Sequence, residues 1–125
     1  MTELKISVKG TPPRPWGSDE WEWRKAIADH AHEFRPQAVS HSKNSKFTIK
    51  IIFWISSSRL GMSDLDNLAK PVLDTLFHSR YAQVKDKTLT GALFDVDDDR
   101  VFKLVLEKKL ALSNKDEGAD ITTSW

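Results

Sequence analysis

Residues 63–77 constrain the fold most, because apolar side chains recur there at the spacing of an α-helix. Such positions form a stripe along one side of the helix, and a stripe of this kind packs into a core. The stripe comprises Leu65, Leu68, Val72 and Leu76. We therefore expect an amphipathic helix from about Leu65 to Phe77. Pro71 has no backbone N–H, so we expect it to kink this helix in its second turn.

The polar residues at the start of this helix are unusual in kind and place. Asp64 and Asp66 stand at its entrance, and Lys70 follows Asp66 by one helical turn on the same face. Two carboxylates and an ammonium at one helix N-terminus form either a solvated cap or half of a metal site. The segment by itself leaves both interpretations open.

A second acidic stretch favours the metal interpretation. Four carboxylates lie within five residues, at Asp95, Asp97, Asp98 and Asp99, just before an apolar run. Their mutual repulsion is relieved by protonation, by solvent or by a divalent cation. Ligands that are all oxygen, in a chain without Cys, suit Mg²⁺ or Mn²⁺. The alternative is a solvated turn that binds nothing.

The remaining pattern predicts a β, α, β, α, β order with at least three strands. A capping box at Asp19 starts a helix that ends at Phe34, before Pro36, and a polar loop follows over 37–45. Alternating or continuous apolar residues mark strands at Leu4–Val8, Lys46–Ile55 and Val101–Leu110, the last two buried on one face. This order predicts an α+β fold, a two-layer sandwich of a mixed β-sheet with helices packed on one side.

Length and composition predict one domain of soluble type. The chain has 125 residues, with 39% hydrophobic and 30% charged. We expect the domain to span 1–110, with 111–125 as a flexible C-terminal tail and 78–90 as either an ordered insertion or a mobile flap. There is no long apolar run and no secretory h-region, and Cys is absent, so we expect a cytoplasmic location.

Charge is unevenly distributed along the chain. The net charge is +1, but residues 1–60 carry +4 and residues 61–125 carry −3. If bound cations cancel the acidic clusters, the remaining surface is basic and can hold phosphates. Arg59, in the loop before Asp64, is a candidate phosphate contact or an ordinary solvated side chain. Trp16 and Trp21 either stack on bases or belong to the core.

The two acidic stretches resemble one known family. Asp64–Lys70 has the sequence D-L-D-N-L-A-K, and the RusA-like Holliday junction resolvases carry D-L-D-N-L-x-K at a helix entrance. That family then carries a hydrophobic–Asp–Asp motif before a strand, which is matched here by Val96–Asp98 ahead of Val101. The motif-level resemblance covers about 64–103, and a looser match of element order extends from Leu4 to Leu110.

The resemblance implies a metal-dependent nuclease site. Asp64, Asp66 and Asp98 correspond to the principal metal ligands, with Asp97 and Lys70 in support. The ion expected is Mg²⁺ or Mn²⁺. Which of Asp97 and Asp98 is the principal ligand stays open.

The resemblance also implies an endodeoxyribonuclease that acts as a homodimer and cuts opposing strands of a four-way DNA junction. Arg14 lies in a Pro-rich turn similar to one in the family, and it joins Arg59, Asn67 and Lys70 as a candidate DNA contact. A dimer is favoured as well by the strand 46–55, whose end is apolar on both faces. Alternatives are a nuclease for other branched or flap DNA, or a non-catalytic metal-stabilised module that binds DNA or another partner.

Overall fold

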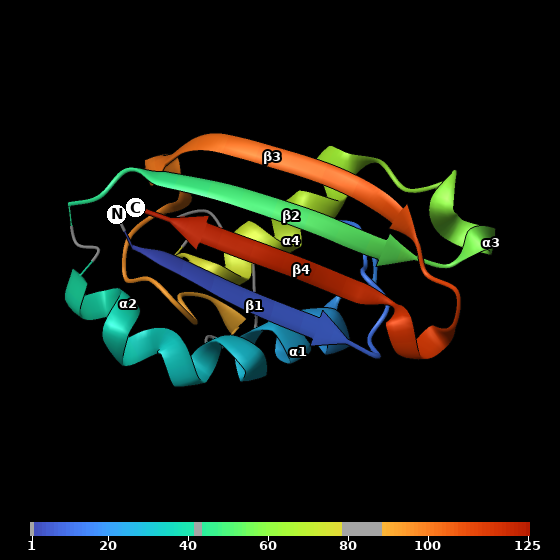
Figure 1. Cartoon of the computed structure of the whole chain (residues 1–125), viewed down its shortest axis with the longest axis horizontal. Coiled ribbons are helices and arrows are strands. Elements are labelled where there is room, and N and C mark those ends of the chain that lie inside the picture. The colour runs from blue at the N-terminus through green and yellow to red at the C-terminus, as the bar shows by residue number, and fades with distance from the viewer. Residues whose placement is uncertain (1, 42–43, 79–88) are drawn as a thin grey trace.

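The fold is a four-stranded mixed sheet with helices on one side, as the computed structural model shows (Figure 1). The structure describes residues 2–41, 44–78 and 89–125. The elements are β1 (Glu3–Lys9), α1 (Trp21–Ala31), η1 (His32–Phe34), α2 (Arg35–His41), β2 (Phe47–Ile55), α3 (Ser57–Leu60), α4 (Leu65–Leu76), η3 (Asp98–Arg100), β3 (Val101–Leu110), η4 (Asn114–Asp116) and β4 (Gly118–Ser124). The predicted α+β fold is confirmed.

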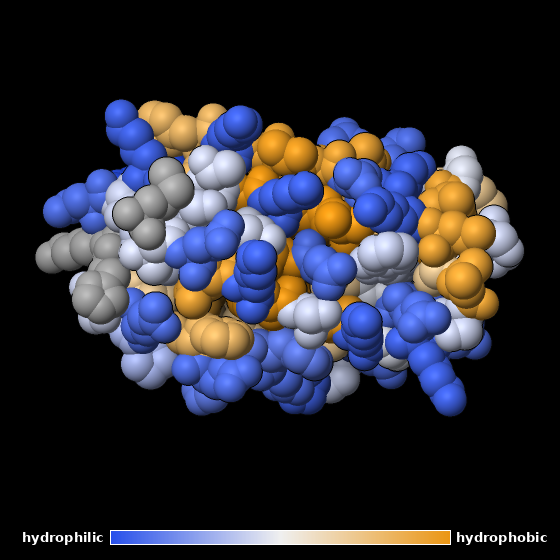
Figure 2. Space-filling model, in the orientation of Figure 1, coloured by the Kyte–Doolittle hydropathy of each residue, from blue (hydrophilic) through white to orange (hydrophobic). Residues whose placement is uncertain are grey.

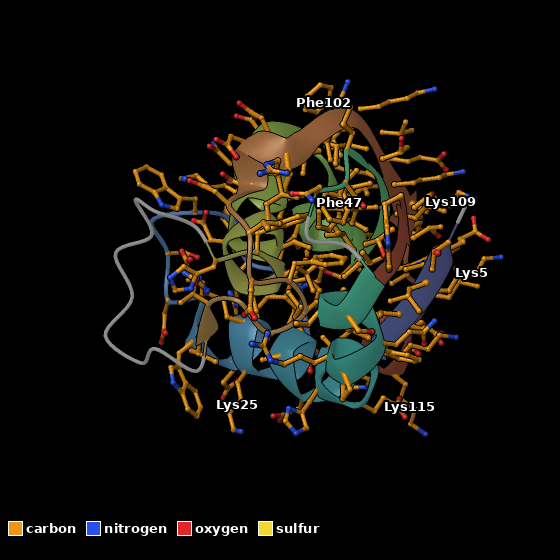
Figure 3. All side chains as sticks on the ribbon, turned by 90° about the vertical axis from the view of Figure 1, so that its left-hand side faces the viewer. Lys5, Lys25, Phe47, Phe102, Lys109 and Lys115 are labelled. Atoms are coloured by element: carbon orange, nitrogen blue, oxygen red, sulfur yellow. The ribbon has the colours of Figure 1, made fainter. Side chains whose placement is uncertain are left out.

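The sheet has the strand order β1-β4-β2-β3. β4 is antiparallel to both of its neighbours, whereas β2 and β3 are parallel. In Figure 1, α1 and α4 lie behind the sheet, and in the side view of Figure 3 Phe47 points from β2 toward the helices while Lys5 and Lys109 point away from them. The sheet therefore buries one face and leaves the other open.

The core forms between the sheet and the two longer helices. Alternate residues of β2 are fully buried because the side chains of a strand point to opposite faces. They meet Trp23 and Ile27 of α1, and Leu68, Val72 and Leu76 of α4, in one cluster. The amphipathic pattern predicted for residues 65–77 is thus confirmed, with the helix ending at Leu76.

The segment expected to be a flexible tail is instead a central strand. β4 lies between β1 and β2 and pairs with both along its length. Ala119, Ile121 and Thr123 are buried, and the residues between them face the open side. Only Ile121, Thr122 and Thr123 of this strand favour β structure, whereas its Gly, Ala and Asp are depleted in strands, so the local sequence did not indicate one. The domain therefore cannot end at residue 110.

Two boundaries near α1 also differ from prediction. The helix begins at Trp21, and its N-cap Glu20 makes no side-chain cap bond, so the capping box at Asp19 is wrong. α1 ends at Ala31 and continues through η1 into α2, which replaces the first part of the expected loop. Pro36 lies in the first turn of α2, where a missing N–H costs no helical hydrogen bond.

β3 spans the predicted residues but is not buried on one face. No residue of this strand is fully buried, because β3 is the edge of the sheet and only β2 covers one side of it. Phe102 is 65% exposed, and Leu104 is 39% exposed. The prediction for residues 78–90 concerns a segment of which 79–88 lie outside the described residues. Among the described helices, none is long and apolar enough to cross a membrane.

Candidate metal and nucleic-acid site

The approach to α4 is held in place by a lysine from β3. Lys108 Nζ donates to the carbonyls of Leu60 at 2.9 Å and Ser63 at 2.7 Å. Ser63 is buried, and its hydroxyl donates to the carbonyl of Arg59. The chain therefore enters α4 at a defined position relative to the sheet, which places Asp64 next.

Asp64 occupies the N-cap position of α4 without capping it through its side chain. Its backbone is extended, with φ −78° and ψ 136°, and its carbonyl accepts the N–H of Leu68 at 3.0 Å. The carboxylate makes no cap hydrogen bond. Asp66 follows in the first turn and is exposed. Both carboxylates therefore lie at the positive end of the helix dipole, where negative charge is favoured.

Pro71 lies inside α4, and the helix continues through it to Leu76. A proline at this position leaves the carbonyl four residues earlier, that of Asn67, without its helical donor. The backbone N–H of Trp16 supplies that donor at 2.9 Å. The Pro-rich loop is thus docked on the first turns of α4 by the bond that Pro71 cannot make.

Lys70 lies between an aromatic ring and a buried carboxylate. Its Nζ is 5.9 Å from the centroid of the Trp16 ring and 3.4 Å from Oδ2 of Asp74. Trp16 is 57% exposed and Trp21 is 49% exposed, so the core interpretation of these two side chains is wrong. A cation beside an exposed aromatic ring can contact both the backbone and the bases of a nucleic acid.

Asp98 brings the second acidic stretch to α4. The pKa of Asp98 is raised to about 6, by burial first and then by a hydrogen bond with Asp97 and the charges of Asp97 and Asp74, while the ammonium of Lys70 lowers it. The charges of Lys70 and Asp74 on α4 therefore both act on Asp98. The connection is fixed by backbone bonds to the end of α4, from Phe94 N–H to the Leu76 carbonyl at 2.9 Å among others.

Asp74 is the residue of this site that sequence reasoning missed. It is only 2% exposed, its Oδ2 faces Lys70, and its Oδ1 has no hydrogen-bond partner in the described structure. Asp66, Lys70 and Asp74 recur every fourth residue, so they form one row along α4. The signal available in the sequence was a carboxylate placed next to the apolar stripe, where a solvated residue is not expected.

A buried arginine supports Asp74 from α1. Arg24 is 5% exposed and donates to Thr75 Oγ1 at 3.0 Å and to the Leu89 carbonyl at 2.9 Å. Burial lowers the pKa of Arg24, and the charges of Asp74 and Glu20 oppose that shift. Asp74 therefore pairs with Lys70 and is also attracted by the charge of Arg24.

The two arginines predicted to contact DNA have different environments. Arg59 is half-buried, and its Nη2 donates to the carbonyl of Pro13, which ties α3 to the Pro-rich loop. Arg14, in the same loop, is exposed. Arg14 is therefore available to an incoming phosphate in this structure, whereas Arg59 holds the loop that carries it.

The donor chemistry of the site suits a hard divalent cation. All candidate ligands are carboxylates, and the pKa of Asp98 is raised by burial first and then by Asp97 and Asp74, a negative charge that a cation would relieve. Within residues 2–41, 44–78 and 89–125, however, no three Asp, Glu or His side chains are grouped closely enough to hold a metal ion. Asp98 interacts electrostatically with Asp97, Lys70 and Asp74, and the joint site of Asp64, Asp66 and Asp98 stays a prediction.

No protein-family model matches the chain, and no curated protein matches it.

Proposed function

We propose that this protein is a metal-dependent endodeoxyribonuclease that resolves four-way DNA junctions. The observation that carries the proposal is electrostatic: Lys70 and Asp74 of α4 both act on the pKa of Asp98 in η3, although the two acidic segments are distant in the sequence. If residue 64 were only a solvated cap and residues 95–99 only a solvated turn, no interaction between the two segments would be expected. Two segments that supply carboxylates and a cation to one place are what phosphodiester hydrolysis requires.

Each residue has a separate part in the proposed reaction. Asp64, Asp66 and Asp98 hold a divalent ion, Mg²⁺ or Mn²⁺, with Asp97 in support. When bound, such an ion activates water and neutralises phosphate charge. Lys70, oriented by its ion pair with Asp74, donates to the phosphate oxygens as negative charge develops on them.

The DNA contacts come from the docked Pro-rich loop and the first turns of α4. Arg14 is exposed for a backbone phosphate, and Trp16 offers an exposed ring beside Lys70. The side chain of Asn67 is also exposed on the first turn, while its carbonyl holds the loop. A homodimer places two such sites on opposing strands of one junction.

The test is cleavage of a labelled four-way junction with Mg²⁺ or Mn²⁺, with and without chelator. We expect paired cuts that the chelator abolishes. A flap and a linear duplex of the same sequence serve as substrate controls. Cleavage of the flap in preference to the junction would support the other branched-DNA function. Binding without cleavage under all of these conditions would support the non-catalytic module.

Asp66→Asn separates binding from cleavage. The change removes a ligand charge and also a negative charge that repels DNA, so cleavage should collapse while junction binding persists or tightens. Binding is measured by gel shift in Ca²⁺ and cleavage in Mg²⁺, at one stated salt concentration. The matched control is Asp29→Asn on α1, which should change neither. If Asp66→Asn cuts at the wild-type rate, the proposed site is wrong.

A further inference from the structure

Among the described strands, β3 exposes the most large hydrophobic side chains, and it forms an edge of the sheet. Four of its residues, Phe102, Leu104, Val105 and Leu110, are among the exposed large hydrophobic side chains. β1, the opposite edge of the sheet, presents none, since its exposed positions are charged or polar. Figure 3 shows Phe102 at the rim of the sheet, away from Phe47 in the core.

An edge strand also offers unpaired backbone groups. β3 pairs with β2 on one side, and no described strand pairs with its other side. The N–H and C=O groups along that side are a template for another strand. Charged residues interrupt the apolar side chains of β3, and Figure 2 shows hydrophilic among hydrophobic residues along the top of the molecule, where β3 lies in Figure 1. The question is whether these charges repel every partner or select one.

Geometry restricts how this edge can pair with itself. In an antiparallel pair, directly opposed residues point to the same face of the sheet. When a two-fold axis relates the two strands, one residue must therefore lie opposite its own copy, and the axis passes beside that residue. With the axis at Leu106, Lys103 of one copy lies opposite Lys109 of the other. With the axis at Glu107, the two copies of Glu107 lie opposite each other. Both arrangements place like charges together, which is destabilising.

Axes at Leu104 and at Val105 both avoid these conflicts within the strand, but only the axis at Val105 gives Lys103 and Glu107 partners of opposite charge. On the open face, Lys103 then lies opposite Glu107 of the second copy, and symmetry repeats the pair. On the helix face, Leu104 lies opposite Leu106. Lys103 and Glu107 belong to the open face because they pair in register with Thr48 and Ile52, which stand between the buried residues of β2.

We propose that β3 pairs antiparallel with β3 of a second copy of this chain, about a two-fold axis at Val105. The two sheets join into one, and the register is selected by the Lys103–Glu107 pairs. The open-face surface around the joint includes Ile52 and Trp54 of β2, both partly exposed. The inference names the surface for the dimer expected in the proposed function, but it is argued from β3 alone.

Charge reversal tests this register without DNA or metal. Lys103→Glu sets two carboxylates opposite each other, and Glu107→Lys sets two ammonium groups opposite each other. Each variant should weaken dimerisation by about tenfold or more. The double variant Lys103→Glu/Glu107→Lys restores opposite charges, so its dimer should return to within about threefold of the wild type. Lys5→Glu on β1, the other edge, is the matched control and should change nothing.

The readout is the dimer dissociation constant from sedimentation equilibrium, with circular dichroism to check that each variant folds. A wild-type protein that stays monomeric at about 100 µM overturns the proposal. The charges of β3 would then serve to prevent edge-to-edge pairing. A double variant as weak as the single variants also overturns it, because the pairing is then elsewhere. Neither Lys103 nor Glu107 belongs to the proposed nuclease site, so failure here leaves the cleavage test unaffected.

Discussion

Lys70 connects the proposed chemistry to the core at the scale of single residues. Its side chain is 46% exposed, while the carboxylate of Asp74 that it faces is buried. A cation held from behind by a buried anion keeps its position without losing access to solvent. This arrangement suits a group that must meet a phosphate in a defined geometry. A side chain already held in that geometry lowers the barrier, because it does not have to be ordered during the reaction.

Lys70→Ala should lower the cleavage rate by about 10²–10³, if its loss resembles loss of one oxyanion donor. The requirement for a divalent ion should remain, because the carboxylates are unchanged. Single-turnover cleavage of a labelled junction measures the rate, and a Mg²⁺ titration measures the requirement. Lys25→Ala, an exposed lysine on α1, should cut at the wild-type rate. A wild-type rate for Lys70→Ala would exclude Lys70 from the reaction.

Asp98 should give the apo protein a distinct pH dependence. Its pKa in the folded chain is about 6, above the value of about 3.9 in an unfolded chain. The folded state therefore binds this proton more tightly, so the contribution of Asp98 to stability is full below pH 4 and is lost as the pH rises through 6. Asp98→Asn carries no charge at any pH and avoids that loss.

The melting temperatures of Asp98→Asn and the wild type, measured in chelator, should consequently diverge as the pH rises from 4 to 7. The variant should be the more stable of the two at pH 7. Asp116→Asn, at an exposed turn, controls for removal of an acidic charge and should show no such divergence. A constant difference between Asp98→Asn and the wild type across this range would contradict the raised pKa.

Among the elements, α1 and α4 are joined by a polar contact within an apolar interface. Arg24 on α1 donates hydrogen bonds to Thr75 of α4 and to the Leu89 carbonyl. Its positive charge is also attracted by the negative charge of Asp74. A buried charge is tolerated only when it is paired and hydrogen-bonded. The helix pair therefore depends on this side chain as well as on apolar burial.

Arg24→Ala should destabilise the fold by about 3–5 kcal/mol, because it leaves the partly buried Glu20 carboxylate without its ion-pair partner and the Leu89 carbonyl without its donor. Urea unfolding, followed by circular dichroism, measures the change. Lys25→Ala on the exposed side of the same helix should cost less than about 0.5 kcal/mol. If the two variants lose similar stability, the Arg24 network is not what joins these helices.

Considering the whole molecule, the C-terminal strand closes the sheet. β4 separates β1 from β2, so β1 has no strand partner without it. Residues 111–125 also supply Trp125, whose ring packs against Phe47 at 5.8 Å and Phe94 at 5.3 Å. The last residues of the chain are thus part of the core.

Deletion of residues 111–125 should prevent folding, with loss of the near-ultraviolet circular dichroism signal and of a cooperative thermal transition. Because a truncated chain can fail for other reasons, a point variant tests the same strand. Ile121→Ala should cost about 2–5 kcal/mol, whereas Thr122→Ala on the open face should cost less than about 0.5 kcal/mol. A folded truncated protein of wild-type stability would contradict the placement of β4.

Local patterns in the sequence determined most of the elements. The alternation around Phe47–Ile55, the 3.6-residue stripe of residues 65–76 and the apolar run at 101–110 each lie where they were predicted. These signals come from side chains that meet the core directly, and burial imposes the period of the element on them. The acidic motifs were visible for the same local reason, because like charges crowd within a few residues.

Only the tertiary structure decided the rest, because there the partner is distant in the chain. β4 is a strand because β1 and β2 provide ladders on both of its sides. α4 keeps Pro71 because the N–H of Trp16 reaches the carbonyl that proline leaves unpaired. Asp74 is buried because Arg24 and Lys70 balance its charge. In each case the local preference is weak or unfavourable, and a long-range hydrogen bond or charge outweighs it.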